Sequence, residues 1–112
     1  MPVTRKKDVI ISGGFNIYPS DIEHHLLEHP DVADAAVVGV PSPDWGESPV
    51  AFIVLSDGGT VREAELADWL NARVGKLQRV RDVVVVGELP RSAIGKVLKR
   101  QLRDEYAERS GR

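Results

Sequence analysis

The sequence predicts a small α+β fold, an α/β sandwich in which about three helices pack on a three-stranded sheet after an N-terminal two-stranded hairpin. Valine-rich apolar runs of strand length alternate with segments whose leucines recur at helical spacing. Glycine and proline clusters separate these segments, as expected for turns. The 112 residues, 42% of them hydrophobic and 29% charged, suit one globular domain.

The N-terminal part of the chain is expected to form the hairpin and the first helix. A short strand over residues 8–12 ends at Gly13 and Gly14, where the backbone must turn sharply. Ser20 and Glu23 have the spacing of a capping box, which predicts that a helix starts there. This helix should end near position 29, since a proline follows it.

The middle of the chain predicts two strands and a second helix. Residues 32–40 are rich in valine and alanine and indicate a buried strand, and residues 50–55 indicate the next one. Thr60 and Glu63 have the spacing of a second capping box. The helix that follows has its apolar residues at helical spacing and is expected to stop at Gly75.

The last part of the chain predicts a strand, a loop and a helix. Residues 83–86 are four valines in a row, typical of a central strand that is covered on both faces. Residues 89–96 have the composition of a loop. Leu98 and Leu102 then mark a helix with a charged outer face, and a frayed tail is expected from Glu108 onward.

Composition and charge exclude several classes of function. The net charge of −2 gives no reason to expect a nucleic-acid partner. The chain has no cysteine, which excludes disulfides, thiolate metal sites and cysteine nucleophiles and suits a cytoplasmic protein. Its polar, basic start predicts neither a signal peptide nor a transmembrane segment. His25 and His29 have the spacing of zinc ligands, but no third ligand accompanies them, so no metal site is expected.

The glycine pair at positions 13 and 14 is the first feature that core packing does not explain. Glycine loses more conformational entropy on folding than other residues, so Gly13 and Gly14 are poor choices for stability alone. Beside an extended segment, such a pair lets a ligand chain lie along the backbone. A plain tight turn is the simpler interpretation of these residues alone.

The loop at residues 89–96 is the second such feature. Proline, serine and glycine surround Arg91 and Lys96, which places two cations on a backbone with few internal contacts. Val97 follows the lysine and the glycine spacing differs, so the loop is not a P-loop. A solvated basic helix face is the simpler interpretation from charge alone. The cations that could instead form one patch for phosphate or carboxylate are Arg91, Lys96, Lys99, Arg100 and Arg103.

Five motifs occur in a fixed order along nearly the whole chain. They are RKKDVIISGGFNIYPSDIE at 5–23, HPDV at 29–32, AAVVGVP at 35–41, WGE at 45–47 and LPRSAIGKVLKR at 89–100. Together they resemble the adenylate-forming enzymes, which include acyl- and aryl-CoA synthetases, luciferases and the adenylation domains of peptide synthetases. The chain departs from the family at residues 77–80, where Leu-Gln-Arg-Val replaces the usual Tyr-Lys-x-Pro.

The resemblance implies that the chain is the C-terminal domain of the adenylate-forming enzyme fold. Residues 1–7 then correspond to the hinge end of the interdomain linker, residues 8–108 to the AMP-binding enzyme C-terminal domain, and residues 109–112 to a tail. In this family the small domain closes over a large N-terminal domain in two orientations, one for acyl-adenylate formation and one for thioester formation.

The resemblance also assigns a role to individual residues. Lys96 aligns with the catalytic lysine that assists attack of the carboxylate on the α-phosphate. Lys7 aligns with the hinge residue, and Arg5 with an arginine that contacts the nucleotide. Gly14 aligns with the glycine that lets pantetheine pass, and Gly13 supports the same turn.

The implied activity is that of an AMP-forming ligase which joins a carboxylic acid, a fatty acid in the first instance, to coenzyme A (CoA). ATP, Mg²⁺ and the acid would bind to the N-terminal domain of the same polypeptide, so the isolated chain is expected to be inactive. One alternative is an adenylation domain that loads an acidic carrier protein, with Arg79 and Arg81 on the surface that meets it. The other is a free-standing binding module without enzymatic activity.

Overall fold

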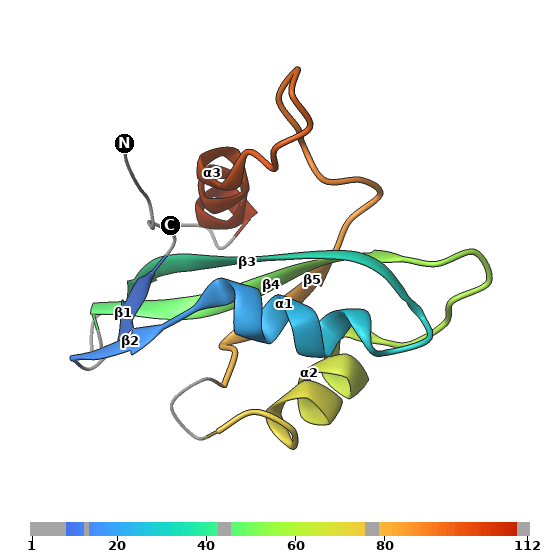
Figure 1. Cartoon of the computed structure of the whole chain (residues 1–112), viewed down its shortest axis with the longest axis horizontal. Helices are drawn as coiled ribbons and strands as arrows, with labels where there is room; N and C mark the ends of the chain where they lie inside the picture. The colour runs from blue at the N-terminus through green and yellow to red at the C-terminus, as the bar shows by residue number, and fades with distance from the viewer. Residues whose placement is uncertain (1–8, 13, 43–45, 76–78, 110–112) are drawn as a thin grey trace.

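The computed structural model describes residues 9–12, 14–42, 46–75 and 79–109. Within these residues, no helix is both long enough and apolar enough to cross a membrane. The elements follow one another in the predicted order (Figure 1). They are β1 (Ile10–Ser12), β2 (Phe15–Ile17), α1 (Pro19–Leu27), β3 (Val32–Ser42), β4 (Gly46–Leu55), α2 (Glu63–Asn71), β5 (Asp82–Val85) and α3 (Lys99–Arg109).

The sheet is organised around β4. Strand β3 pairs antiparallel with it from Val32 opposite Leu55 to Ser42 opposite Gly46. Strand β5 pairs parallel with the middle of β4, and the β1–β2 hairpin joins the start of β4 where Ser12 lies opposite Gly46. The predicted fold class is confirmed, because a mixed three-stranded sheet carries an N-terminal hairpin and three helices.

Helices cover both faces of this sheet. Helices α1 and α2 lie on one face, and α3 lies on the other (Figure 1). Neighbouring strand residues point to opposite faces, so Val37 packs with α1 and α2 while Val38 packs with α3. Val83 and Val84 of β5 divide in the same way. Burial on both sides explains why these strands are apolar throughout instead of alternating with polar residues.

Strand β5 lies at an edge of the sheet, so the prediction of a central strand is wrong. Among the described strands it pairs with β4 only. The valine run at 83–86, three residues of which lie in β5, led to that prediction. The valines reflect the cover on both faces of the strand, and an edge strand can be covered on both faces as well as a central one. On its open side, the Val85 N–H donates to Glu63 Oε2 of α2 at 2.7 Å, and the Val83 N–H donates to Asp82 Oδ1 at 2.9 Å.

The capping box expected at Ser20 and Glu23 is also wrong. Helix α1 begins one residue earlier, at Pro19, whose fixed φ suits the first helical turn. The Glu23 carboxylate faces β3 and α3 instead of the helix start. Its Oε2 accepts the Val37 N–H at 2.9 Å and lies 2.9 Å from Lys99 Nζ. The Glu23 side chain therefore contacts residues of β3 and α3 and does not form the helix cap that the local pattern predicts.

The second predicted capping box, at Thr60 and Glu63, is wrong for a similar reason. Asp31 Oδ2, which lies after α1, accepts the Thr60 N–H and the next backbone N–H, each at 3.0 Å. Helix α2 begins at Glu63, and Glu65 Oε1 accepts the Arg62 N–H at 3.0 Å. Asp31 thus holds the segment before the helix from another part of the chain, and the capping contact at the helix start lies at Arg62 and Glu65, two residues later than predicted.

Several elements end at positions other than those expected. Helix α1 stops at Leu27 and α2 stops at Asn71, so both are shorter than predicted. Strands β3 and β4 are longer, because their pairing continues through Ser42 and Gly46. The ladder extends past the valine-rich runs since backbone hydrogen bonds do not require apolar side chains.

Replacing Glu23 with alanine should lower the free energy of unfolding by about 1–3 kcal/mol, because the Val37 N–H loses its acceptor and the largely buried Lys99 side chain loses this ion pair. Urea denaturation followed by circular dichroism measures this. Glu28→Ala is the matched control, since that carboxylate is exposed at the C-cap of the same helix and, in the described residues, has ion-pair contacts with His24 and His25 only. It should change stability by less than about 0.5 kcal/mol. Equal losses in the two variants would contradict the structural role of Glu23.

Candidate functional site

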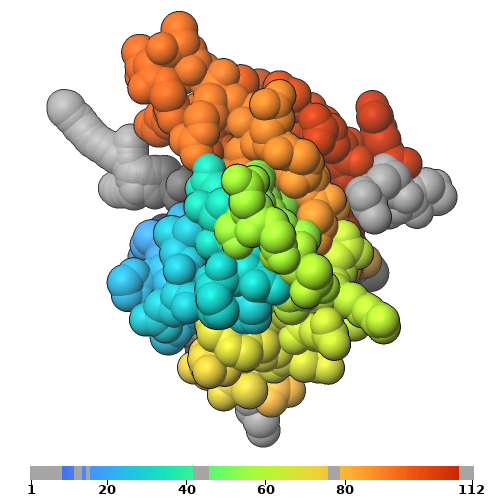
Figure 2. All heavy atoms as spheres, turned by 90° about the vertical axis from the view of Figure 1, so that its right-hand side faces the viewer, coloured from blue at the N-terminus to red at the C-terminus, as the bar shows by residue number. Residues whose placement is uncertain are grey.

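Lys96 lies on a hairpin that connects β5 to α3. Arg91 and Val97 form an antiparallel bridge, and the Leu98 N–H donates to the Pro90 carbonyl at 2.8 Å. The hairpin extends away from the sheet on the side that α3 covers (Figure 1). Figure 2 shows it in orange as a lobe at the top of the molecule. Its position makes the end of the hairpin accessible from outside the domain.

The turn of this hairpin is closed by its own hydrogen bonds. The Gly95 N–H donates to the Ser92 carbonyl at 2.9 Å, and the Ser92 N–H donates to the Lys96 carbonyl at 2.8 Å. Gly95 has a φ of +86°, a left-handed conformation that glycine adopts without steric cost. A three-residue loop that ends in such a glycine is a common hairpin connection. The expectation of a backbone with few internal contacts is therefore wrong.

The side chain of Lys96 is exposed. In the part of the chain that the structure describes, no carboxylate pairs with its ammonium group. Its neighbour Ile94, at the tip of the turn, is 87% exposed. The hairpin thus presents a cation and an apolar side chain that the described domain does not use for its own packing.

Arg91, by contrast, is used within the domain. Its guanidinium donates to the Gly95 carbonyl at 2.8 Å and forms an ion pair with the Asp34 carboxylate on β3. Asp34 Oδ1 in turn accepts the Ala35 N–H at 2.9 Å. The two loop cations that sequence analysis singled out therefore differ, since Arg91 holds the hairpin and Lys96 is presented by it.

The five cations near the hairpin do not act as one patch. Arg91 is neutralised by Asp34, and the side chain of Lys99, only 17% exposed, pairs with Glu23. Arg100 and Arg103 lie exposed on α3. Sequence analysis missed Asp34 and Glu23 as partners. A carboxylate inside the valine-rich run of β3 is a usable signal, because such a group is rarely left unpaired in a buried strand.

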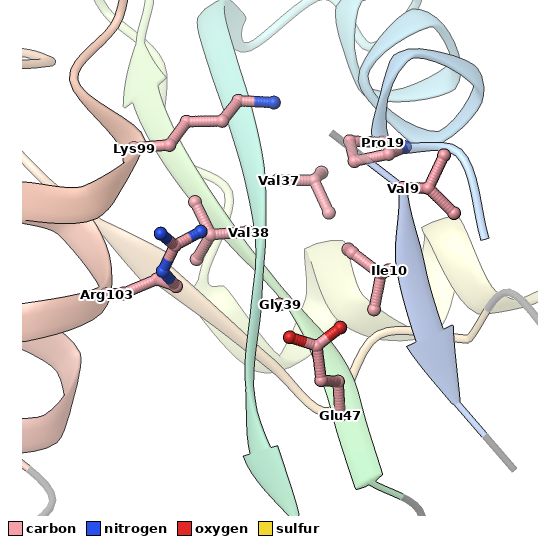
Figure 3. Close-up of a pocket in the computed structure, with 9 residues that line it drawn as sticks. All are labelled: Val9, Ile10, Pro19, Val37, Val38, Gly39, Glu47, Lys99 and Arg103. Carbon is pink, nitrogen blue, oxygen red and sulfur yellow. The ribbon is translucent and has the colours of Figure 1, made fainter. Parts of the chain in front are cut away.

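A small pocket lies between α3, β3 and the start of β1 (Figure 3). Lys99 and Arg103 border it on one side and Glu47 on the other. The Glu47 carboxylate accepts the Ile11 N–H at 3.0 Å. The pocket volume of about 60 Å³ is far below the several hundred Å³ of a typical ligand site. The pocket is therefore too small for such a site, and two of its polar groups, Lys99 and Glu47, join elements of the fold.

The β1–β2 turn contains Gly14, which has a φ of +84°. This left-handed backbone conformation is by itself a sufficient reason for a glycine here. Among the described residues, no atom beyond those next to Gly14 in the chain lies within 4 Å of the position that a Cβ would occupy, so the described part of the domain leaves this space open. Both interpretations of the glycine pair, a tight turn and room for a ligand chain, agree with this geometry. The other predicted site residues, Arg5, Lys7 and Gly13, lie outside the described residues.

The histidines have contacts of their own. His24 and His25 lie 3.8 and 3.7 Å from carboxylate oxygens of Glu28. His29 Nδ1 accepts the Asp31 N–H at 3.0 Å. Within the described residues, no group of three histidine, aspartate or glutamate side chains could hold a metal ion. The histidines therefore contribute to contacts within the domain, and the candidate site is the Lys96 cation on its hydrogen-bonded turn.

This fold is that of a known class of domain. Residues 21–96 match the family model described as the AMP-binding enzyme C-terminal domain. The chain belongs to this family.

Several relatives are similar over most of the chain. The 2-succinylbenzoate--CoA ligase of Bacillus cereus is 48% identical over 99 residues, which cover 88% of this chain and 20% of the relative. The 4-coumarate--CoA ligase-like 9 of rice, Oryza sativa subsp. japonica, is 44% identical over 107 residues, covering 96% of this chain and 19% of the relative. The crystal structure of apo MatB from Rhodopseudomonas palustris superposes with a TM-score of 0.87 at 40% identity, over 93% of this chain and 21% of that protein. The chain therefore spans about a fifth of the length of these relatives.

Lysine labelling tests the geometry of the site. Reductive methylation with limiting formaldehyde should modify Lys96 much faster than Lys99, because Lys96 is exposed and Lys99 is largely buried against Glu23. Peptide mass spectrometry over time measures both rates. Glu23→Gln should accelerate modification of Lys99 and leave Lys96 unchanged. Similar rates for the two lysines in the unmodified sequence would rule out this arrangement.

Proposed function

We propose that this chain is the mobile C-terminal domain of an AMP-forming ligase that joins a carboxylic acid to CoA, and that Lys96 serves acyl-adenylate formation. The observation that carries the proposal is the exposed Lys96 at the end of a hydrogen-bonded hairpin that stands out from the domain. A cation in this position can enter the active site of a second domain. The membership of the chain in its family supports such a second domain.

In the first half-reaction, a carboxylate oxygen of the acid forms a bond to the α-phosphorus of ATP, and pyrophosphate leaves with the bonding electrons. Two anions must meet, and negative charge concentrates on the oxygens between them. The Lys96 ammonium would stabilise that charge more in the transition state than in the ground state. Contacts of this kind are commonly worth about 10²–10³ in rate. ATP and Mg²⁺ would bind to the N-terminal domain.

In the second half-reaction, the thiol of CoA attacks the acyl carbon, and AMP leaves. We assign the open space beside Gly14 to the passage of the pantetheine chain. Lys96 and the Gly14 turn belong to different parts of the domain, so one domain needs two orientations to use both. A rotation about a hinge at Lys7 would supply them, since a few backbone torsions can absorb such a movement.

The identity of the acid depends on the N-terminal domain in this proposal. The names of the relatives refer to different acids, 2-succinylbenzoate among them, although their C-terminal domains are alike. A fatty acid remains a prediction. These names also favour CoA over a carrier protein as the thiol acceptor.

A domain exchange tests the role of Lys96 without knowledge of the acid. This chain replaces the C-terminal domain of the Bacillus cereus ligase, and the chimera receives ATP, Mg²⁺ and 2-succinylbenzoate. The chimera should release pyrophosphate, while Lys96→Ala should slow this step by about 10²–10³. Thioester formation from preformed acyl-adenylate should change little.

The controls of the domain exchange are the isolated chain, which should release no pyrophosphate, and Arg73→Gln. Arg73 is an exposed cation that stacks on Trp69 of α2, and α2 lies on the opposite side of the sheet from the hairpin (Figure 1). A chimera no more active than the N-terminal domain alone would contradict the proposed function. Equal losses of Lys96→Ala in both half-reactions would contradict the role of the lysine.

Gly14→Val should have the reverse effect in the same chimera. A branched side chain beside the turn would obstruct pantetheine, so thioester formation should fall by about 10-fold or more while adenylation persists. Gly58→Val is a matched control, since Gly58 has a φ of +79° and, in the part of the chain that the structure describes, also has no atom within 4 Å of the Cβ position apart from its chain neighbours. Both variants carry a similar backbone strain of roughly 1–2 kcal/mol. If the two variants form thioester equally fast, Gly14 does not line the path.

A further inference from the structure

We propose that the ion pair between Arg91 and Asp34 sets the position of Lys96 relative to the sheet, and that adenylation depends on it. The inference rests on the proposed function of Lys96. It adds two positioning residues, one on the hairpin and one on β3, which lie 57 positions apart in the sequence.

Arg91 links the turn of the hairpin to the body of the domain. One guanidinium nitrogen donates to the carbonyl of Gly95, the residue directly before Lys96, at 2.8 Å. Another nitrogen of the same group pairs with Asp34. The guanidinium is planar and rigid, so these two contacts hold the turn at a defined place beside β3.

Asp34 is itself held in orientation by the backbone. It lies at the register shift between Val32 and Asp34, where β3 is irregular against β4. Its Oδ1 accepts the Ala35 N–H at 2.9 Å, which leaves Oδ2 for Arg91. The carboxylate is therefore oriented by the sheet before the hairpin binds to it.

This link is confined to one side-chain pair. Leu89 before the hairpin and Leu102 after it are buried, so the base of the hairpin is fixed by packing. In the described residues, the side chains of the turn make no other hydrogen bond or ion pair to the sheet. Without the Arg91–Asp34 pair, the end of the hairpin is free to tilt and to displace the Lys96 ammonium.

The exposure of the pair argues for positioning over stability. The two side chains are 42% and 37% exposed, and exposed ion pairs contribute little to the free energy of folding. A displacement of a catalytic group by about 1 Å, however, can cost up to about 100-fold in rate. The pair is therefore expected to matter for the adenylation rate much more than for stability.

Asp34→Asn gives the sharpest test, because it removes the charge on β3 and leaves the amino-acid sequence of the hairpin, including Arg91, unchanged. The asparagine oxygen can still accept the Ala35 N–H. The background is the complete protein with its N-terminal domain, and the Bacillus cereus chimera serves as a second background of known substrate. Adenylation should fall by about 10-fold, while thioester formation from preformed acyl-adenylate and the urea midpoint of unfolding stay as in the unmodified protein.

Arg91→Gln and the double variant complete the test. If the two residues act through one contact, the double variant should adenylate no more slowly than Arg91→Gln alone. Arg73→Gln again controls for loss of one positive charge. If Arg91 contacted a substrate anion directly, Asp34→Asn would leave adenylation unchanged or faster, which would overturn the inference.

Two further results would overturn the inference. One is additive losses in the double variant, and the other is an equal fall of both half-reactions in Asp34→Asn. The proposed function has its own readouts, which are adenylation by the unmodified protein and its loss in Lys96→Ala. A failure of the inference is thus distinguishable from a failure of the function.

Discussion

The antiparallel pairing of β3 with β4 is the constraint on which the rest of the domain depends. It places one set of side chains toward α1 and α2 and the alternate set toward α3, as Val37 and Val38 show. A shift of register by one residue would exchange the two sets and would mismatch both helix layers at once. Strand β5 and the β1–β2 hairpin then attach to β4 at different points along its other side. The elements that carry the Lys96 hairpin and the Gly14 turn are thus placed by this ladder.

Side-chain carboxylates, some from the strand itself and some from helices, complete the edges of the sheet. On the open side of β3, the N–H groups of Ala35 and Val37 are accepted by Asp34 and Glu23. On the open side of β5, Glu63 of α2 accepts the Val85 N–H. Unpaired strand amides would otherwise invite pairing with another chain. Two of these carboxylates, Glu23 and Asp34, also bind a cation next to the Lys96 hairpin, so edge protection and hairpin anchoring share the same groups.

The anchored hairpin implies that the movement required by the proposed function is a rotation of the whole domain. The hydrogen-bonded turn and its Arg91 link make the hairpin a fixed part of the domain surface. Lys96 would therefore arrive in an active site and leave it through rotation of the domain, and not through a swing of its loop. A fixed cation also suits the chemistry, because stabilising the charge of a transition state depends on groups that need not reorganise during the reaction.

The sequence by itself determined the fold class, the order of the elements, the resemblance to a family and the choice of Lys96 and Gly14 as candidate residues. These depend on local periodicity and on motifs in order, which are properties of the chain alone. Only the tertiary structure decided that β5 lies at an edge, that Glu23 binds Val37 and Lys99 instead of capping α1, and that Arg91 meets Asp34. A charged side chain can satisfy either a local or a distant partner. Which one it meets is set by packing that brings together residues far apart in the sequence.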